Sequence, residues 1–90
     1  MSYAIQIIGY TDDTVCEVAG QYVQSFDFDG AAGRGIGRYV HRATDAMRFT
    51  TKLEALTFVQ TQSRVKPLRG DGQPNRPLCG CHVVIAELLD

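Results

Sequence analysis

Arginine is the residue type in this sequence with the clearest capacity for chemistry at a surface. Its guanidinium stays charged at physiological pH and offers N–H donors in a planar fork that fits carboxylates and phosphates. All nine Lys and Arg residues lie within residues 34–76, together with only three acidic residues, although the whole chain has a net charge of -1. This basic segment predicts contact with an acidic partner. The candidate partner-binding residues are Arg34, Arg38, Arg42, Arg69, Asp71, Asn75 and Arg76.

The same basic segment leaves a nucleic-acid-binding module open as the alternative. Arg38 and Arg42 alternate on an expected strand with Tyr39 between them, so the arginines could hold phosphates while the ring stacks on a base. Nucleic-acid-binding domains usually carry a clear excess of positive charge, which this chain lacks as a whole. A host protein or ribonucleoprotein complex is therefore the favoured partner.

Cysteine and histidine supply the second set of reactive side chains, at Cys16, His41, Cys79, Cys81 and His82. A zinc site needs four ligands, and no second pair completes the one that Cys79 and Cys81 would form. A cysteine nucleophile needs a neighbouring base, but Cys81 and His82 point to opposite faces of an expected strand. We therefore expect no metal, no cofactor and no catalysis. A small enzyme or metal-binding protein stays as the second alternative.

Four glycines in residues 30–37 suggest a phosphate-binding loop at first sight. The segment lacks both the Gly-Lys-Ser/Thr of a P-loop and the third glycine of a dinucleotide-binding fingerprint. A strand is expected after it, where a phosphate site would need a helix N-terminus. These features predict a mobile hairpin tip that carries Arg34.

The periodicity of the chain predicts the elements that position these residues. Strands are expected at residues 3–8, 21–28, 38–43 and 82–88, and a helix at 52–63. Thr51 and Glu54 form a capping box for that helix, with Leu53, Leu56 and Val59 on its apolar stripe. The order β-β-β-α-β indicates an α+β fold: one domain over residues 1–90, with a small, mostly antiparallel sheet and one main helix on one face.

The expected strands also carry predictions about neighbours. Residues 21–28 place Tyr22, Gln24, Phe26 and Phe28 on one face, and pairing with residues 38–43 would set acid opposite base. The last strand is apolar on both faces, which predicts a central position and leaves a homodimer open. Residues 66–78 contain three prolines and form a long connection that is either functional or packed on the body.

Bulk properties narrow the cellular setting. No apolar run approaches the roughly 20 residues that span a bilayer, and the first residues lack the features of a secretory signal. Three cysteines make an odd count without staple-like spacing, which favours reduced thiols. We expect a cytoplasmic protein with no membrane partner.

Residues 67–78 resemble the C-terminal signature of small phage and prophage proteins, most of them uncharacterised. Ala46-Met47-Arg48-Phe49 and Glu54-Ala55-Leu56-Thr57-Phe58 are similar to segments of the same family. The likeness covers about the second half of the chain and brings no catalytic residues. It implies a phage accessory protein that binds and inhibits a host defence complex in the bacterial cytoplasm, as anti-CRISPR proteins do; that last comparison rests on context alone.

Overall fold

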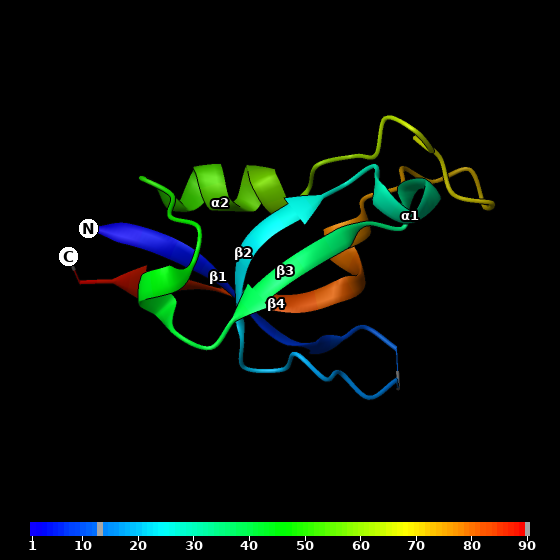
Figure 1. Ribbon diagram of the computed structural model, residues 1–90. Coiled ribbons are helices and arrows are strands. Elements are labelled where there is room, and N and C mark those ends of the chain that lie inside the picture. Colours follow the sequence, from blue (N-terminus) through cyan, green and yellow to red (C-terminus); the bar gives the residue numbers. More distant parts are fainter. Residues whose placement is uncertain (13, 90) are drawn as a thin grey trace.

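The protein forms a four-stranded antiparallel sheet with strand order β3-β2-β1-β4 and one main helix, α2 (Figure 1). The computed structural model describes residues 1–12 and 14–89. The expected α+β fold is confirmed. The strands are β1 (Ser2–Tyr10), β2 (Tyr22–Asp27), β3 (Ile36–Val40) and β4 (Cys81–Leu88). The helical elements are α1 (Gly30–Gly33), η1 (Ala43–Asp45), α2 (Lys52–Val59) and η2 (Pro77–Gly80).

Strand β1 lies at the centre of the fold, flanked by β2 and β4. Its consecutive residues Ala4 and Ile5 are both fully buried, and because neighbours on a strand point to opposite faces, both faces are covered there. The expectation that the last strand is central is wrong. In the described part of the chain β4 is an edge strand whose one neighbour is β1, and Val84 on it is 47% exposed.

Helix α2 begins at the predicted capping box. The backbone N–H of Glu54 donates to the Thr51 hydroxyl at 3.1 Å, and the Glu54 carboxylate accepts from the N–H of Thr50 at 3.4 Å. The predicted apolar stripe is wrong apart from Val59. The helix buries Ala55 and Val59, whereas Leu53 is 73% exposed, because the small alanine is what allows close packing on the sheet.

Strand β2 carries an irregularity that reverses its side-chain alternation. The register against β3 shifts between Val23 and Ser25. Val23 is buried, the next two residues are both exposed, and Phe26 is again partly buried, so the inward face changes from odd to even positions. The predicted single face of alternate residues is therefore interrupted. Ser25 lies opposite Arg38, and the β3 partner of Asp27 is apolar, so this register does not set acid opposite base.

Two segments far apart in the sequence meet at one end of the molecule, away from both chain termini (Figure 1). They are the tip of the β2–β3 hairpin, residues 29–35, and the connection from α2 to β4, residues 60–80. We call these two segments together the distal end. In the described part of the chain, no helix has both the length and the apolar character needed to cross a bilayer.

Candidate functional site: an arginine-lined cleft

Asn75 joins the two segments of the distal end. Its side-chain amide donates to the carbonyl oxygens of Gly33 and Lys66, both at 2.8 Å. Its backbone N–H donates to Pro67 at 2.8 Å, and its carbonyl accepts from Ser63 at 2.9 Å. The Asn75 amide nitrogen is thus used to hold the hairpin tip against the connection, a structural role that the sequence did not reveal.

Asp29 makes the reciprocal link from the hairpin tip. Its Oδ1 atom accepts from the N–H of Arg64 at 2.7 Å, the Ser63 hydroxyl at 3.1 Å and the N–H of Val65 at 3.3 Å. The Arg64 hydrogen bond is the main cause that lowers the pKa of this carboxyl below its ordinary value. Asp29 therefore stays ionised while it fixes the turn that follows α2.

The hairpin tip turns with unusual backbone geometry. Ala31 and Ala32 have φ angles of 53° and 57°, and Gly33 and Gly35 both have φ of 89°. Left-handed backbone costs an alanine roughly 1–2 kcal/mol, so the surrounding contacts must hold the turn. A Cβ on Gly33 would lie 2.6 Å from the Lys66 Cβ, which shows how closely the segments pack. The tip is a hairpin turn, as predicted, but it is docked on a neighbouring segment.

The connection folds back on itself as a small hairpin of its own. Leu68 and Pro74 form an isolated bridge, and the Arg69 N–H donates to Gln73 at 2.8 Å. At its tip the Arg69 guanidinium donates two hydrogen bonds to the Asp71 carboxylate, from Nε at 3.2 Å and from Nη2 at 2.5 Å. This pairing is the main cause of the lowered pKa of Asp71.

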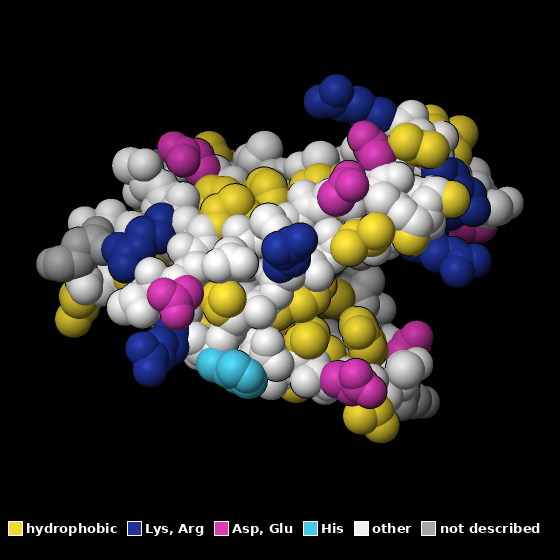
Figure 2. All heavy atoms as spheres, viewed as in Figure 1, with side chains coloured by type: hydrophobic (Ala, Val, Ile, Leu, Met, Phe, Trp, Pro, Cys, Tyr) yellow, Lys and Arg dark blue, Asp and Glu magenta, His cyan; other side chains and the backbone are white. Residues whose placement is uncertain are grey.

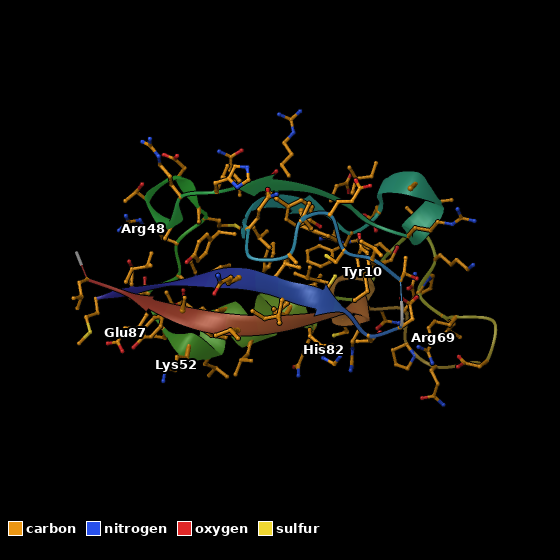
Figure 3. The ribbon with its side chains drawn as sticks, turned by 90° about the horizontal axis from the view of Figure 1, so that it is seen from below. Tyr10, Arg48, Lys52, Arg69, His82 and Glu87 are labelled. Atoms are coloured by element: carbon orange, nitrogen blue, oxygen red, sulfur yellow. The ribbon has the colours of Figure 1, made fainter. Side chains whose placement is uncertain are left out.

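Between the two segments lies a cleft of about 510 Å³. Its polar walls carry three arginines, and Thr11 closes it from the end of β1 by donating its N–H and hydroxyl to the Gly80 carbonyl, at 3.0 and 3.1 Å. Figure 2 shows Lys and Arg side chains at this end of the surface as well as at the opposite end, and Arg69 lies in the connection at the far end from Glu87 (Figure 3). The residues that line the cleft are Thr11, Arg34, Arg69, Gln73, Pro74, Asn75, Arg76, Pro77, Cys79 and Gly80.

The cleft brings together part of the predicted partner-binding set. Arg34, Arg69, Asn75 and Arg76 line it, and Asp71 is paired with one of them. Arg38 and Arg42 lie outside, exposed on β3 and just after it.

Two of the arginines are available to a ligand. Within the described residues, the guanidiniums of Arg34 and Arg76 have no acidic partner, whereas Arg69 already shares its charge with Asp71. Several guanidinium groups in one concave site fit the carboxylates of acidic side chains, or phosphate groups.

Sequence reasoning missed three contributors to the site: Asp29, Ser63 and Thr11. Asp29 followed by glycine reads as an ordinary turn, and nothing in its neighbourhood points to a contact with residues 63–65. Ser63 is nearly fully buried and its hydroxyl donates to Asp29. A single serine after a helix gives no sequence signal for such a contact. The sequence feature that did point to such contacts was the long three-proline segment, because a connection of that length is expected to be functional or to pack on the rest of the domain.

Cys81 lies in a different environment from an activated nucleophile. Burial is the main cause that raises the pKa of Cys81, with Cys16 and Cys79 adding to it, so the thiol stays protonated at neutral pH. Burial likewise raises the pKa of Tyr39 to about 12. The Cys79 thiol points to the Val59 carbonyl at 3.4 Å. Among the residues that the structure describes, no three His, Cys, Asp or Glu side chains are grouped to hold a metal ion.

Comparison with known proteins found no match for this chain among protein-family models, curated proteins or solved structures.

Proposed function

We propose that this chain is a non-catalytic binding protein whose arginine-lined cleft accepts acidic side chains of a partner protein. The observation that carries the proposal is the convergence of Arg34 with Arg69 and Arg76 on one cleft, from segments far apart in the sequence. Two of these guanidiniums lack an acidic partner within the described residues, so a carboxylate would find unused fork donors there.

The shape of the charged surface favours a protein partner over a nucleic acid. A long phosphate backbone needs a continuous basic track. Here the arginines of the cleft are gathered in a space of about 510 Å³, and Arg38 and Arg42 lie outside it. Charge complementarity of this local kind steers encounter and sets specificity.

Residues 67–78, which resemble the phage signature, form most of one wall of this cleft. The choice of a bacterial defence complex as the first partner to test, and of inhibition as the outcome, rests on that resemblance alone.

The test compares two double substitutions that change charge equally. Arg34→Glu with Arg76→Glu alters the cleft, and Arg38→Glu with Arg42→Glu alters exposed arginines outside it. We expect the first pair to abolish capture of a partner from bacterial lysate, measured by mass spectrometry, and the second pair to retain it. If the cleft variant captures the same proteins as wild type, the site is wrongly assigned.

A second measurement separates the ligand classes. Amide chemical shifts of the labelled protein are followed during titration with polyglutamate and with a single-stranded oligonucleotide. We expect polyglutamate to shift the signals of Arg34 and Arg76. Preferential, steeply salt-dependent binding of the oligonucleotide would replace the proposal with the nucleic-acid alternative.

A further inference from the structure

The outer edge of β4 presents free backbone groups whose positions follow from the hydrogen bonds of β1. Tyr3 exchanges two backbone hydrogen bonds with Phe49, at 2.9 and 2.8 Å. Ile7 donates to Gln21 at 2.8 Å and accepts from Gly20 at 2.7 Å. These partners lie on the side of β1 away from β4, because the side toward β4 is occupied by the β1–β4 ladder.

Successive residues of a strand direct their backbone N–H and C=O to opposite sides. The even-numbered residues of β1 therefore bond toward β4. Their register partners on β4 are Val84 for Gln6, Ala86 for Ala4 and Leu88 for Ser2.

In an antiparallel pair, residues directly opposite each other are either both hydrogen-bonded or both not. Val84, Ala86 and Leu88 thus bond to β1, and the residues between them face outward. The free edge consists of the N–H and C=O groups of Val83, Ile85 and Glu87. Among the described residues, no strand lies beyond β4 (Figure 3).

We propose that this edge binds a second copy of the chain, with the two β4 strands antiparallel and a two-fold axis through Ile85. In that register Ile85 faces Ile85 of the second copy, and Val83 faces Glu87 of the second copy. Every free N–H and C=O group of these residues then meets a complementary group. In this register the three residues pair only with one another, so no residue outside this set is needed.

The side chains beside the edge agree with a second copy as the occupant. Glu87 would lie opposite Val83, so no like charges face each other across the junction. Val84 is 47% exposed and would lie opposite Ala86 of the second copy. Burying these apolar groups would add a hydrophobic contribution to the backbone pairing.

The opposite edge of the sheet is protected in the way that natural sheets usually are. β3 has only five residues, and its exposed Arg38 would bring like charges together in a symmetric pair. β4 has eight residues, without lysine or proline along its length. Self-association is therefore expected through β4 and not through β3.

The first experiment uses the wild-type chain, by sedimentation velocity and by amide hydrogen exchange at low and high protein concentration. We expect a mass near twice 9.9 kDa at high concentration. Exchange at Val83, Ile85 and Glu87 should slow as concentration rises, while Val84 and Ala86 should be protected throughout. A monomer at all concentrations overturns the proposal. A dimer whose three outward amides keep exchanging quickly overturns this interface.

The second experiment uses Glu87→Pro with Glu87→Gln as its control. Proline removes an N–H that faces the second copy and leaves the ladder to β1 intact, because edge positions tolerate it. We expect self-association weaker by roughly tenfold or more for Glu87→Pro, and unchanged for Glu87→Gln. Equal dimerisation of both variants contradicts the register. If Glu87→Pro does not fold, the wild-type exchange pattern decides alone.

The interface is independent of the arginine-lined cleft. The Arg34→Glu, Arg76→Glu variant should dimerise like wild type, and Glu87→Pro should keep its cleft contacts. Failure of one proposal therefore leaves the other standing.

Discussion

The sheet body and the distal end use different forces to hold their shape. The body encloses Ile5, Ile7 and Val23, which are almost fully buried among other apolar side chains. The distal end depends on directional hydrogen bonds that Asn75 donates and Asp29 accepts. Apolar burial is insensitive to pH and tolerates small shifts, whereas hydrogen bonds demand geometry and respond to protonation.

This division has a functional consequence. A binding cleft that is held by a few polar contacts can loosen or change without loss of the sheet. The body supplies the rigid support, and the distal end supplies a surface whose shape depends on single side chains. Four substitutions or conditions test how separate the two regions are.

The largest effect is expected from Leu78→Ala, where the two regions meet. Leu78 is fully buried in η2 and belongs to the core of the body, while its neighbours line the cleft. Removing its side chain should lower the free energy of unfolding by about 3 kcal/mol. Urea denaturation followed by circular dichroism measures this, and a change well below 1 kcal/mol would mean that the two regions are not joined through Leu78.

A smaller and more local effect is expected from Asn75→Ala. The two side-chain hydrogen bonds to Gly33 and Lys66 are lost, at a combined cost of about 2 kcal/mol. Faster amide exchange should be confined to residues 29–35 and 63–76. The control Gln73→Ala, which also alters a residue of the cleft wall, should leave exchange unchanged; loss of protection throughout β1 would show that the distal end is not separable.

Acid should release the distal end before the body. The pKa of Asp29 is lowered in the folded chain, chiefly by the Arg64 N–H, so its ionised form stabilises the fold above the ordinary carboxyl range. That contribution is lost as pH falls through the folded pKa. Amide signals of Arg64 and Val65 should shift with this titration, while those of β1 stay constant. In Asp29→Asn the shift should disappear; its persistence would assign it to another carboxyl.

The smallest effect is expected from Leu53→Ala. Leu53 belongs to the apolar stripe that periodicity predicts, but it is 73% exposed in the fold. The free energy of unfolding should change by less than about 0.5 kcal/mol. Val59→Ala is the matched comparison on the buried face, with a larger loss. Equal losses in thermal denaturation would restore the predicted stripe.

Local signals predicted most of the elements but few of their partners. The capping box at Thr51 was visible because its two residues are close in sequence. Strand periodicity indicated all four strands, but β3 begins two residues and ends three residues before the expected 38–43, so Arg42 lies after the strand. The buried face of α2 was missed because leucines suggested the stripe while Ala55 makes the contact. The shift in β2 after Val23 was missed because an irregular register has no reliable sequence pattern.

The sequence indicated which residues belong to the candidate site, but not which of them lie close together in space. Arg34, Arg69 and Arg76 stood out by type and by their place among turn-forming residues. That they share a cleft while Arg38 lies outside depends on contacts over 42 positions of sequence, between Asn75 and Gly33. Long-range contacts of this kind follow from the packing of whole elements.

The sequence by itself determined the α+β class, the helix start at Thr51 and the confinement of basic residues to the middle of the chain. These depend on intrinsic preferences and spacing within a few residues. Only the tertiary structure decided that β1 is central, that β4 has a free edge, and that the hairpin tip and the connection enclose a cleft. The physical reason is that strand order and loop docking depend on burial and hydrogen bonding between distant segments, which become defined only when all of them pack together.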